Sequence, residues 1–274
     1  MTAAATLSEL QDQIRLRYDE LSKRLQQVGQ YLLDNPDRVA FDTVAVIASE
    51  ANVPPSTLIR FANAFGFAGF NDMKHLFRRN LVEETSNYSD RLKLFRALET
   101  DEQTPHTPPD ILRTFAQANA NALEQLAART PPEQLDQAIN LLHQAETIYI
   151  VGLRRSFSIA SYLTYALRHV GRRTILIDGL GGMFNEQLGM IGEKDAVIAI
   201  SFTPYANETV EMVEKAVSSG AKLVSITDSQ VSPVSSLSDV CFVVKEASVE
   251  GFRAQSASLC LAQTLAVSLA GKNE

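Results

Sequence analysis

The sequence is poor in cysteine and has no long apolar run. Its two cysteines, Cys241 and Cys260, have no CxxC spacing and no neighbouring histidine, so we expect two buried thiols rather than a disulfide or a metal site. No apolar stretch approaches the roughly 20 residues that a membrane-spanning helix needs. The first residues, MTAAATLSELQDQ, lack the basic start and apolar centre of a secretory signal. These absences predict a cytoplasmic protein with no membrane segment, metal or cofactor.

Positive charge is also scarce. The 25 lysines and arginines are outnumbered by 32 aspartates and glutamates, which gives a net charge of -7. Such a chain lacks the broad basic field of a protein that coats nucleic acid, and it shows no aromatic platforms of an RNA-binding module. Residues 55–80 are an exception with a local charge of +3, from Arg60, Lys74, Arg78 and Arg79 against Asp72. The composition therefore leaves room for a local contact with nucleic acid.

Two kinds of pattern divide the 274 residues, a length that favours two domains. Residues 1–85 have helical apolar spacing throughout. The expected helices run from about Leu7 to Leu33, where Pro36 follows, then from after Thr43, from after Pro54, and from Asn71 as N-cap towards Glu84. Residues 86–110 are polar and end in a proline-rich stretch, which predicts a linker.

Residues 111–274 alternate helical patterns with short apolar runs, which are typical of strands buried on both faces. The runs are residues 147–151, 174–178, 196–201, 222–227 and 240–244. Helical stretches separate or follow them at residues 158–170, 183–191, 208–219 and 253–269. This alternation predicts an α/β domain with a five-stranded parallel sheet and helices on both of its faces.

The helices expected after Thr43 and after Pro54 carry matching apolar stripes. Both follow the spacing i, i+3, i+4 and i+7, through Val44, Ile47, Ala48 and Ala51, then Leu58, Phe61, Ala62 and Phe65. Only residues 52–54 separate the two helices, which forces the sharp crossing of a helix-turn-helix. Gly66 then stands at the position of a helix C-cap glycine.

Packing of these stripes would turn a polar face of the second helix outward. We expect this face to carry Ser56, Thr57, Arg60 and Asn63. Arginine bonds guanine bidentately, asparagine bonds adenine, and serine or threonine bonds a base or a phosphate. We therefore predict that these residues contact DNA, together with Thr43 and Lys74. The alternative is an ordinary surface helix that shows the same residue types to water.

Two of the predicted strands end in turns that carry hydroxyl groups. Gly152 and Ser156 follow the first strand, and Ser201, Thr203 and Thr209 follow the third. Such turns direct backbone N–H groups and the positive end of a helix dipole at an anion. Open α/β sheets bind ligands in the crevice beyond the strand ends. We therefore expect a phosphorylated small molecule at this edge of the sheet.

The stretch IASEANVPPSTLIRFANAFGFAGFNDMKHLFRR resembles the DNA-binding region of the RpiR/MurR-type bacterial transcriptional regulators. The matching positions are Val53, Thr57, Arg60-Phe61, Gly66-Phe67, Gly69-Phe70 and Lys74. Two positions differ, since Asn52 replaces a turn glycine and Pro54 replaces the usual capping serine. Asparagine adopts the left-handed conformation more readily than most residues, and Pro55 suits the first turn of a helix.

Residues 147–244 are similar to the sugar isomerase (SIS) domain of these regulators, which implies a SIS-like fold with flavodoxin-like layering. In that domain a Gly-x-Gly-Arg-Ser turn and a Ser-x-Ser-Gly-x-Thr turn hold the phosphate of a sugar phosphate. Here Arg154 replaces the second glycine of the first turn, and residues 204–207 are inserted in the second. The implied effector-binding residues are Gly152, Arg154, Arg155, Ser156, Ser201, Thr203 and Thr209.

The resemblance implies a transcriptional regulator whose affinity for double-stranded DNA changes when a phosphorylated, sugar-like effector binds. Symmetric dimers match palindromic operators, so we expect self-association to a homodimer or homotetramer. The alternative is a sugar phosphate isomerase, which needs a general base near the substrate carbon. Glu208 and Glu250 are candidate bases, whereas His143 and His169 fall within helical stretches. We expect a regulator without catalytic residues.

Overall fold

The computed structural model describes residues 4, 6–84, 89–90, 92–94 and 107–272. The chain divides into two compact units, Met1–Thr104 and Pro105–Glu274. Among the described residues, no helix is both long and apolar enough to cross a membrane.

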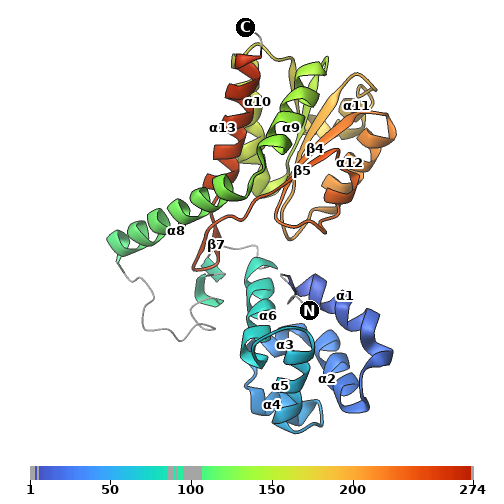
Figure 1. Cartoon of the computed structure of the whole chain (residues 1–274), viewed down its shortest axis with the longest axis vertical. Helices are drawn as coiled ribbons and strands as arrows, with labels where there is room; N and C mark the ends of the chain where they lie inside the picture. The colour runs from blue at the N-terminus through green and yellow to red at the C-terminus, as the bar shows by residue number, and fades with distance from the viewer. Residues whose placement is uncertain (1–3, 5, 85–88, 91, 95–106, 273–274) are drawn as a thin grey trace. The chain divides into compact units, whose positions relative to one another are not determined.

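The described part of the first unit consists of helices around one apolar core (Figure 1). They are α1 (Leu7–Arg17), α2 (Lys23–Asp34), α3 (Pro36–Phe41), α4 (Val44–Glu50), α5 (Pro55–Ala64) and α6 (Phe70–Glu84). The single helix predicted from Leu7 to Leu33 is wrong. A 3-10 turn at Tyr18–Glu20 and extended backbone at Leu21 and Ser22 divide it into α1 and α2. Helix α6 begins one residue before Asn71, which was predicted to cap it.

The sequence pattern does not predict helix α3, because Pro36 indicates only the end of the helix before it. Pro36 does follow α2, but it also occupies the first turn of α3. Its fixed φ and missing N–H cost nothing at that position, so a proline is well suited to start a helix. One proline thus separates two consecutive helices.

A parallel sheet lies at the centre of the second unit, and the predicted five-stranded sheet is confirmed. Its strands agree with the apolar runs to within one residue at each end: β1 (Ile148–Val151), β2 (Thr174–Ile177), β3 (Ala196–Ile200), β4 (Lys222–Thr227) and β5 (Val240–Val243). Their order is β2-β1-β3-β4-β5, which is the flavodoxin-like order. Strands β1 and β3 are buried along their whole length, which explains their uninterrupted apolar sequence.

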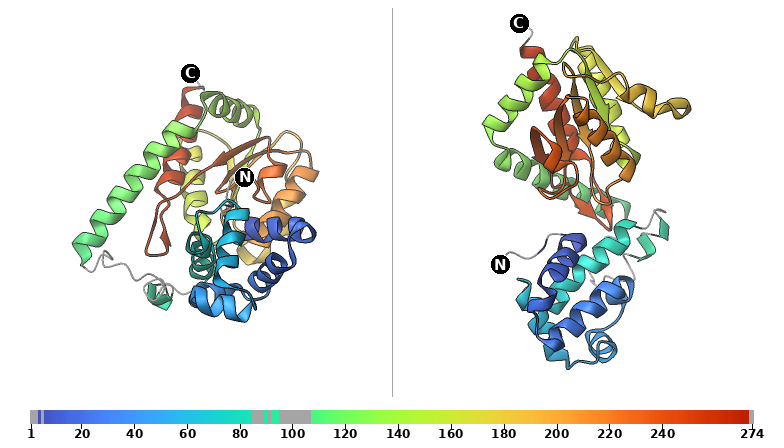
Figure 2. Two further views of the ribbon diagram at one scale, coloured as in Figure 1. Left: turned by 60° about the horizontal axis from the view of Figure 1, so that its bottom comes forward. Right: turned by 90° about the vertical axis from the view of Figure 1, so that its right-hand side faces the viewer.

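Helices cover both faces of the sheet (Figure 1). On one face lie α9 (Pro132–Gln144), α10 (Phe157–His169) and α13 (Ser256–Gly271), and on the other lie α11 (Phe184–Leu188) and α12 (Asn207–Ser218). A longer helix, α8 (Pro108–Arg129), packs against α13 and extends beyond the sheet (Figure 2). Helix α8 starts inside the predicted linker, because Pro108 lies in its first turn and Thr107 caps it. Residues 95–106 of that linker lie outside the described part of the chain.

A short hairpin joins β5 to α13. Its strands are β6 (Ser248–Val249) and β7 (Phe252–Arg253). The helical pattern predicts a start near Arg253, but because of the hairpin α13 begins at Ser256. The hairpin places Arg253 near the carboxyl end of β4, with a guanidinium nitrogen 3.9 Å from an Asp228 carboxylate oxygen.

The order of the strands reverses between β1 and β3. The chain leaves β1 for α10 on one face of the sheet and leaves β3 for α12 on the other. Connections that diverge in this way open a crevice at the carboxyl edge of the sheet, where ligands of such folds bind. The two predicted hydroxyl-bearing turns follow these two strands.

Candidate functional sites

Helices α4 and α5 are joined by the short turn that the sequence predicts. Asn52 in this turn has a φ of 53°, so asparagine adopts the left-handed conformation expected at a glycine position. The Val53 N–H donates to the Ala48 carbonyl over 2.9 Å at the end of α4. Pro55 lies in the first turn of α5, and Pro54 at the N-cap makes no side-chain capping bond. The expected start of α5 at Pro55 is therefore confirmed.

Apolar packing fixes the orientation of α5. Leu58, Phe61 and Phe65 are completely buried, and the ring centres of the two phenylalanines are 4.7 Å apart. Gly66 has a φ of 84° and ends the helix. Since these side chains point into the core, they decide which residues of α5 reach the surface.

The exposed side of α5 carries a regular row of residues. Ser56, Arg60 and Asn63 are exposed, as the sequence predicts, and Ile59 is 49% exposed beside them. Ser56, Ile59, Arg60 and Asn63 follow the spacing i, i+3, i+4 and i+7, and we call them the α5 outer stripe. Sequence reasoning missed Ile59, although the spacing alone could have found it. The polar members of the stripe have the donors and acceptors that read base edges.

Thr57 does not belong to the α5 outer stripe. The prediction that it faces outward is wrong, because the residue is only 5% exposed. Thr57 precedes Phe61 by four residues, so the two side chains lie on the same side of the helix. The residue type had favoured a DNA contact, but the phase of the helix places Thr57 against the core.

Lys74 is also buried, at 5% exposure, so its predicted place on the DNA-contacting surface is wrong. It belongs to a buried side of α6 that includes Phe70, Met73 and Phe77. Its ammonium group donates to the Asp42 carbonyl, and burial lowers the pKa of Lys74. This bond satisfies a carbonyl at the C-terminal end of α3, where basic side chains are favourable.

Thr43 is exposed and caps α4. Its Oγ1 accepts from the Val46 N–H over 3.3 Å, which fixes the start of the helix. The contact of Thr43 with DNA stays a prediction.

The turn after β1 is tightly packed. A Cβ atom added at Gly152 would lie 3.0 Å from both the Ala160 Cβ and the Ser156 carbonyl oxygen, so only glycine fits without a shift. Arg154 has a φ of 54°, in the left-handed region that favours glycine, the residue expected at this position of the SIS pattern. The Arg155 carbonyl accepts from the Gln255 side-chain amide over 2.7 Å. The start of α13 therefore supports this turn.

The turn after β3 is held by a carboxylate from the neighbouring strand. Asp228 follows β4, and its oxygens accept from the Thr203 N–H over 3.2 Å and from the Tyr205 hydroxyl over 2.8 Å. Burial raises the pKa of Tyr205, so the phenol keeps the proton that it donates to Asp228. Ser201 and Thr209 are buried at the two ends of this turn. Asp228, Tyr205 and the nearby Arg253 were missed by sequence reasoning.

One ion pair connects the two turns. An Arg154 guanidinium nitrogen lies 3.4 and 3.5 Å from the two carboxylate oxygens of Glu208, in the first turn of α12. One predicted effector residue of the β1 turn, Arg154, thus reaches the first turn of α12 across the strand reversal. Both side chains are exposed, so the pair contributes little to stability. Its members are accessible to a ligand.

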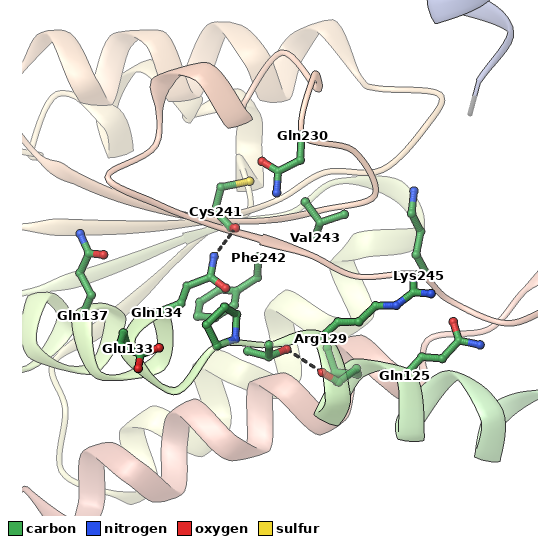
Figure 3. A pocket seen from close by; sticks show the side chains of 13 residues that line it. Gln125, Arg129, Glu133, Gln134, Gln137, Gln230, Cys241, Phe242, Val243 and Lys245 are labelled. Atoms are coloured by element: carbon green, nitrogen blue, oxygen red, sulfur yellow. Dashed lines mark hydrogen bonds between the residues drawn. The ribbon is translucent and has the colours of Figure 1, made fainter. Parts of the chain in front are cut away.

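A pocket of about 570 Å³ lies elsewhere, at the edge strand β5 (Figure 3). It contains none of the predicted effector residues. Gln134 donates to the Cys241 carbonyl over 2.7 Å (Figure 3). Gln137 donates to the Asp239 carbonyl over 3.4 Å. These amides cap outward carbonyls of an edge strand, which accounts for part of the polar lining.

Cys241 and Cys260 are both free, and both are half-buried rather than buried as predicted.

Two family models match the chain. The model described as "Helix-turn-helix domain, rpiR family" matches residues 8–84, and the model described as "SIS domain" matches residues 141–272. The helix-turn-helix, the parallel sheet and both candidate sites lie within these ranges.

The chain is similar over most of its length to curated transcriptional regulators. The HTH-type transcriptional regulator HexR of Pseudomonas aeruginosa is 25% identical over 237 residues, which cover 86% of this chain and 78% of that protein. An uncharacterized HTH-type transcriptional regulator of Clostridium perfringens is 24% identical, over 77% of this chain and 72% of that protein. The structure of the Vibrio vulnificus NanR protein complexed with ManNAc-6P has the same fold, with a TM-score of 0.57 and 23% identity, and covers 96% of this chain and 92% of that one.

Replacing Gly152 by alanine tests the packing of the β1 turn. We expect Gly152→Ala to lower the free energy of unfolding of the second unit by about 1–3 kcal/mol, because the added methyl group overpacks the contact with Ala160. The matched control is Gly192→Ala, where the nearest neighbouring atom is 4.0 Å away. Chemical denaturation followed by circular dichroism measures the free energy of unfolding of both variants. Equal free energies for Gly152→Ala and Gly192→Ala would contradict the requirement for glycine at 152.

Proposed function

Since the chain belongs to the RpiR family of transcriptional regulators with a SIS domain, we propose that it binds double-stranded DNA through α5 and responds to a phosphorylated sugar or related metabolite. The proposed DNA-binding domain comprises residues 1–85 and the proposed effector domain residues 111–274. A regulator of this kind acts on DNA in the bacterial cytoplasm, where we place it.

The observation that carries the DNA-binding proposal is the α5 outer stripe. In a helix-turn-helix the second helix enters the major groove and presents its exposed side chains to the base edges. Arg60 has the fork geometry for guanine and Asn63 the amide for adenine, whereas Ser56 bonds a base or a phosphate near the helix start. Thr43, at the N-terminus of α4, is proposed to contact a phosphate. Thr57 and Lys74 are excluded from the contact set because they are buried.

Self-association follows from the way such proteins read DNA. Two copies related by a two-fold axis place two recognition helices one helical turn apart on a palindromic site. We propose a homodimer or a homotetramer as the DNA-binding form.

The proposed effector site lies at the reversal between β1 and β3. Gly152, Arg155 and Ser156 from one turn, and Ser201, Thr203 and Thr209 from the other, would surround the phosphate. The turn from Gly152 to Ser156 leads into α10, and Ser156 is the N-cap of this helix. The N–H groups at the N-terminus of a helix favour an anion. The complex of the NanR protein with ManNAc-6P supports the choice of a phosphorylated sugar as the effector class.

Arg154 is proposed to bind the phosphate of the effector at this site. A phosphate carries about two negative charges near neutral pH and attracts a guanidinium more strongly than the single charge of Glu208 does. Arg154 would then exchange its exposed pair with Glu208 for the effector phosphate.

An isomerase is the second candidate function, but the described residues favour it less. Glu208, one of the two predicted bases, faces a guanidinium and is exposed, whereas a general base is better placed in a protected site. Glu250, the other predicted base, is buried at 9% exposure in the turn of the β6–β7 hairpin, outside the two turns that carry the predicted effector residues. His169 ends α10, a helix that runs back from the carboxyl edge, so it lies away from that edge. We therefore propose a binding protein without catalytic activity.

Arg60→Ala tests the DNA-binding proposal. We expect a roughly 5- to 150-fold loss of affinity for a duplex enriched from a random library by the wild-type chain, since one bidentate base contact is removed. Fluorescence anisotropy with the full chain measures this loss. Arg15→Ala, an exposed arginine on α1, is the matched control and should bind as the wild type does. Unchanged affinity of Arg60→Ala would contradict the proposal.

The pair Ser156→Ala and Ser201→Ala tests the effector site. We expect the double variant to lose any increase in melting temperature that a panel of sugar phosphates, including ManNAc-6P, produces in the wild-type chain. The control is Ser218→Ala with Ser219→Ala, at the opposite end of α12. A thermal shift that persists in the first variant would place the effector elsewhere in the molecule.

A further inference from the structure

One member of the α5 outer stripe has no hydrogen-bonding group. Ser56, Arg60 and Asn63 carry donors or acceptors, but Ile59, in the middle of the row, presents an aliphatic side chain that is 49% exposed. Its neighbours Thr57 and Leu58 point into the core. The exposed side of α5 thus carries one apolar side chain among polar ones.

Packing within the first unit does not account for this isoleucine. Ile59 belongs neither to the buried core nor to the partly buried residues that pack against it. A β-branched residue is also a poorer helix former than alanine, lysine or glutamate, so an exposed position gains nothing from it. Single exposed apolar residues are common on protein surfaces, and Leu16 on α1 is another. The position of Ile59 within the stripe is what distinguishes it.

The side chain of Ile59 is well suited to a fixed contact. In a helix, an isoleucine has one strongly preferred χ1 rotamer, so its methyl groups occupy a defined place above α5. A flexible side chain such as methionine would lose more entropy on forming the same contact. Ile59 therefore presents a rigid apolar surface on the exposed side of α5.

The major groove offers one apolar group to such a surface. Guanine, cytosine and adenine show only hydrogen-bonding atoms there, whereas thymine also shows its C5-methyl group. Contact between the aliphatic side chain and this methyl group removes both from water. Cytosine has the same shape without the methyl group and places an amino donor nearby, which an apolar side chain leaves unsatisfied.

We propose that Ile59 contacts the C5-methyl group of a thymine and selects this base at one position of the DNA site. The proposal rests on the proposed function, since it requires α5 to lie in the major groove. It adds a specificity that the polar residues of the stripe do not supply.

Deoxyuridine provides the test, because it pairs as thymidine does but lacks the methyl group. The probe is a duplex enriched from a random library by the wild-type full chain, with each thymine replaced in turn by uracil. At one position we expect the wild type to lose about fourfold in affinity, the factor for burying one methyl-sized group. Ile59→Ala should bind the unmodified duplex about fourfold or more weakly and should show no further loss at that position.

Two variants serve as controls. Ile59→Val keeps a β-branched side chain and should retain most of the sensitivity to uracil. Val46→Ala removes another exposed aliphatic side chain, 40% exposed on α4, and should respond to uracil as the wild type does. Circular dichroism during heating verifies that each variant is folded.

The outcomes separate this proposal from the one on which it rests. One outcome overturns only the role of Ile59. In it, the wild type binds the duplex and Arg60→Ala weakens binding, but no replacement of a thymine by uracil lowers the affinity of the wild type. The same holds if Ile59→Ala keeps the full sensitivity at the affected position. If the wild type enriches no sequence from the library, base reading by α5 fails, and the role of Ile59 fails with it.

Discussion

Burial of Leu58, Phe61 and Phe65 beneath α5 is the constraint on which the proposed DNA-contacting surface depends. Once these side chains occupy the core, the rotation of the helix about its own axis is fixed, and every other residue of α5 has an assigned side. Ser56, Ile59, Arg60 and Asn63 are exposed as a consequence. The left-handed conformation of Asn52 then lets the chain turn sharply between α4 and α5. The chemistry available to DNA is thus set by apolar packing on the opposite side of the helix.

A comparable constraint operates in the second unit. The order of the parallel strands reverses between β1 and β3, so two turns that are far apart in sequence meet at the carboxyl edge of the sheet. Side chains from more distant elements hold these turns in place: Asp228 after β4 holds the β3 turn, and Gln255 before α13 holds the β1 turn. Because these supports come from fixed elements, the two turns that carry the hydroxyl groups of the proposed effector site are held in place without a ligand.

The strands and the helix-turn-helix could be predicted from the sequence, because each depends on local patterns. Continuous apolar runs mark strands buried on both faces, and the paired stripes of α4 and α5 mark their mutual packing. The division between α1 and α2 was missed because helical apolar spacing continues across residues 18–22, whereas the backbone there forms a 3-10 turn and is then extended at Leu21 and Ser22. Helices α3, α8 and α9 were not predicted; each begins at a proline, which also suits the first turn of a helix.

The candidate sites were predicted less completely, for two physical reasons. Thr57 and Lys74 have residue types that suit DNA, but exposure depends on the phase of the helix, and both lie on the inner side. Asp228, which follows β4, contacts the β3 turn and Arg253 of β7, and these contacts support the proposed effector site. Such contacts are set by the tertiary fold, and no local pattern in the sequence predicts them.

Coupling between effector and DNA is the central claim, and affinity measured with and without effector tests it most directly. The full-length chain would be titrated onto the enriched duplex in the presence of each sugar phosphate of the panel. For at least one of them we expect the affinity for DNA to change by roughly 5- to 150-fold, and the duplex should change the affinity for that sugar phosphate by the same factor. An affinity for DNA that stays constant while a sugar phosphate is bound would contradict the account.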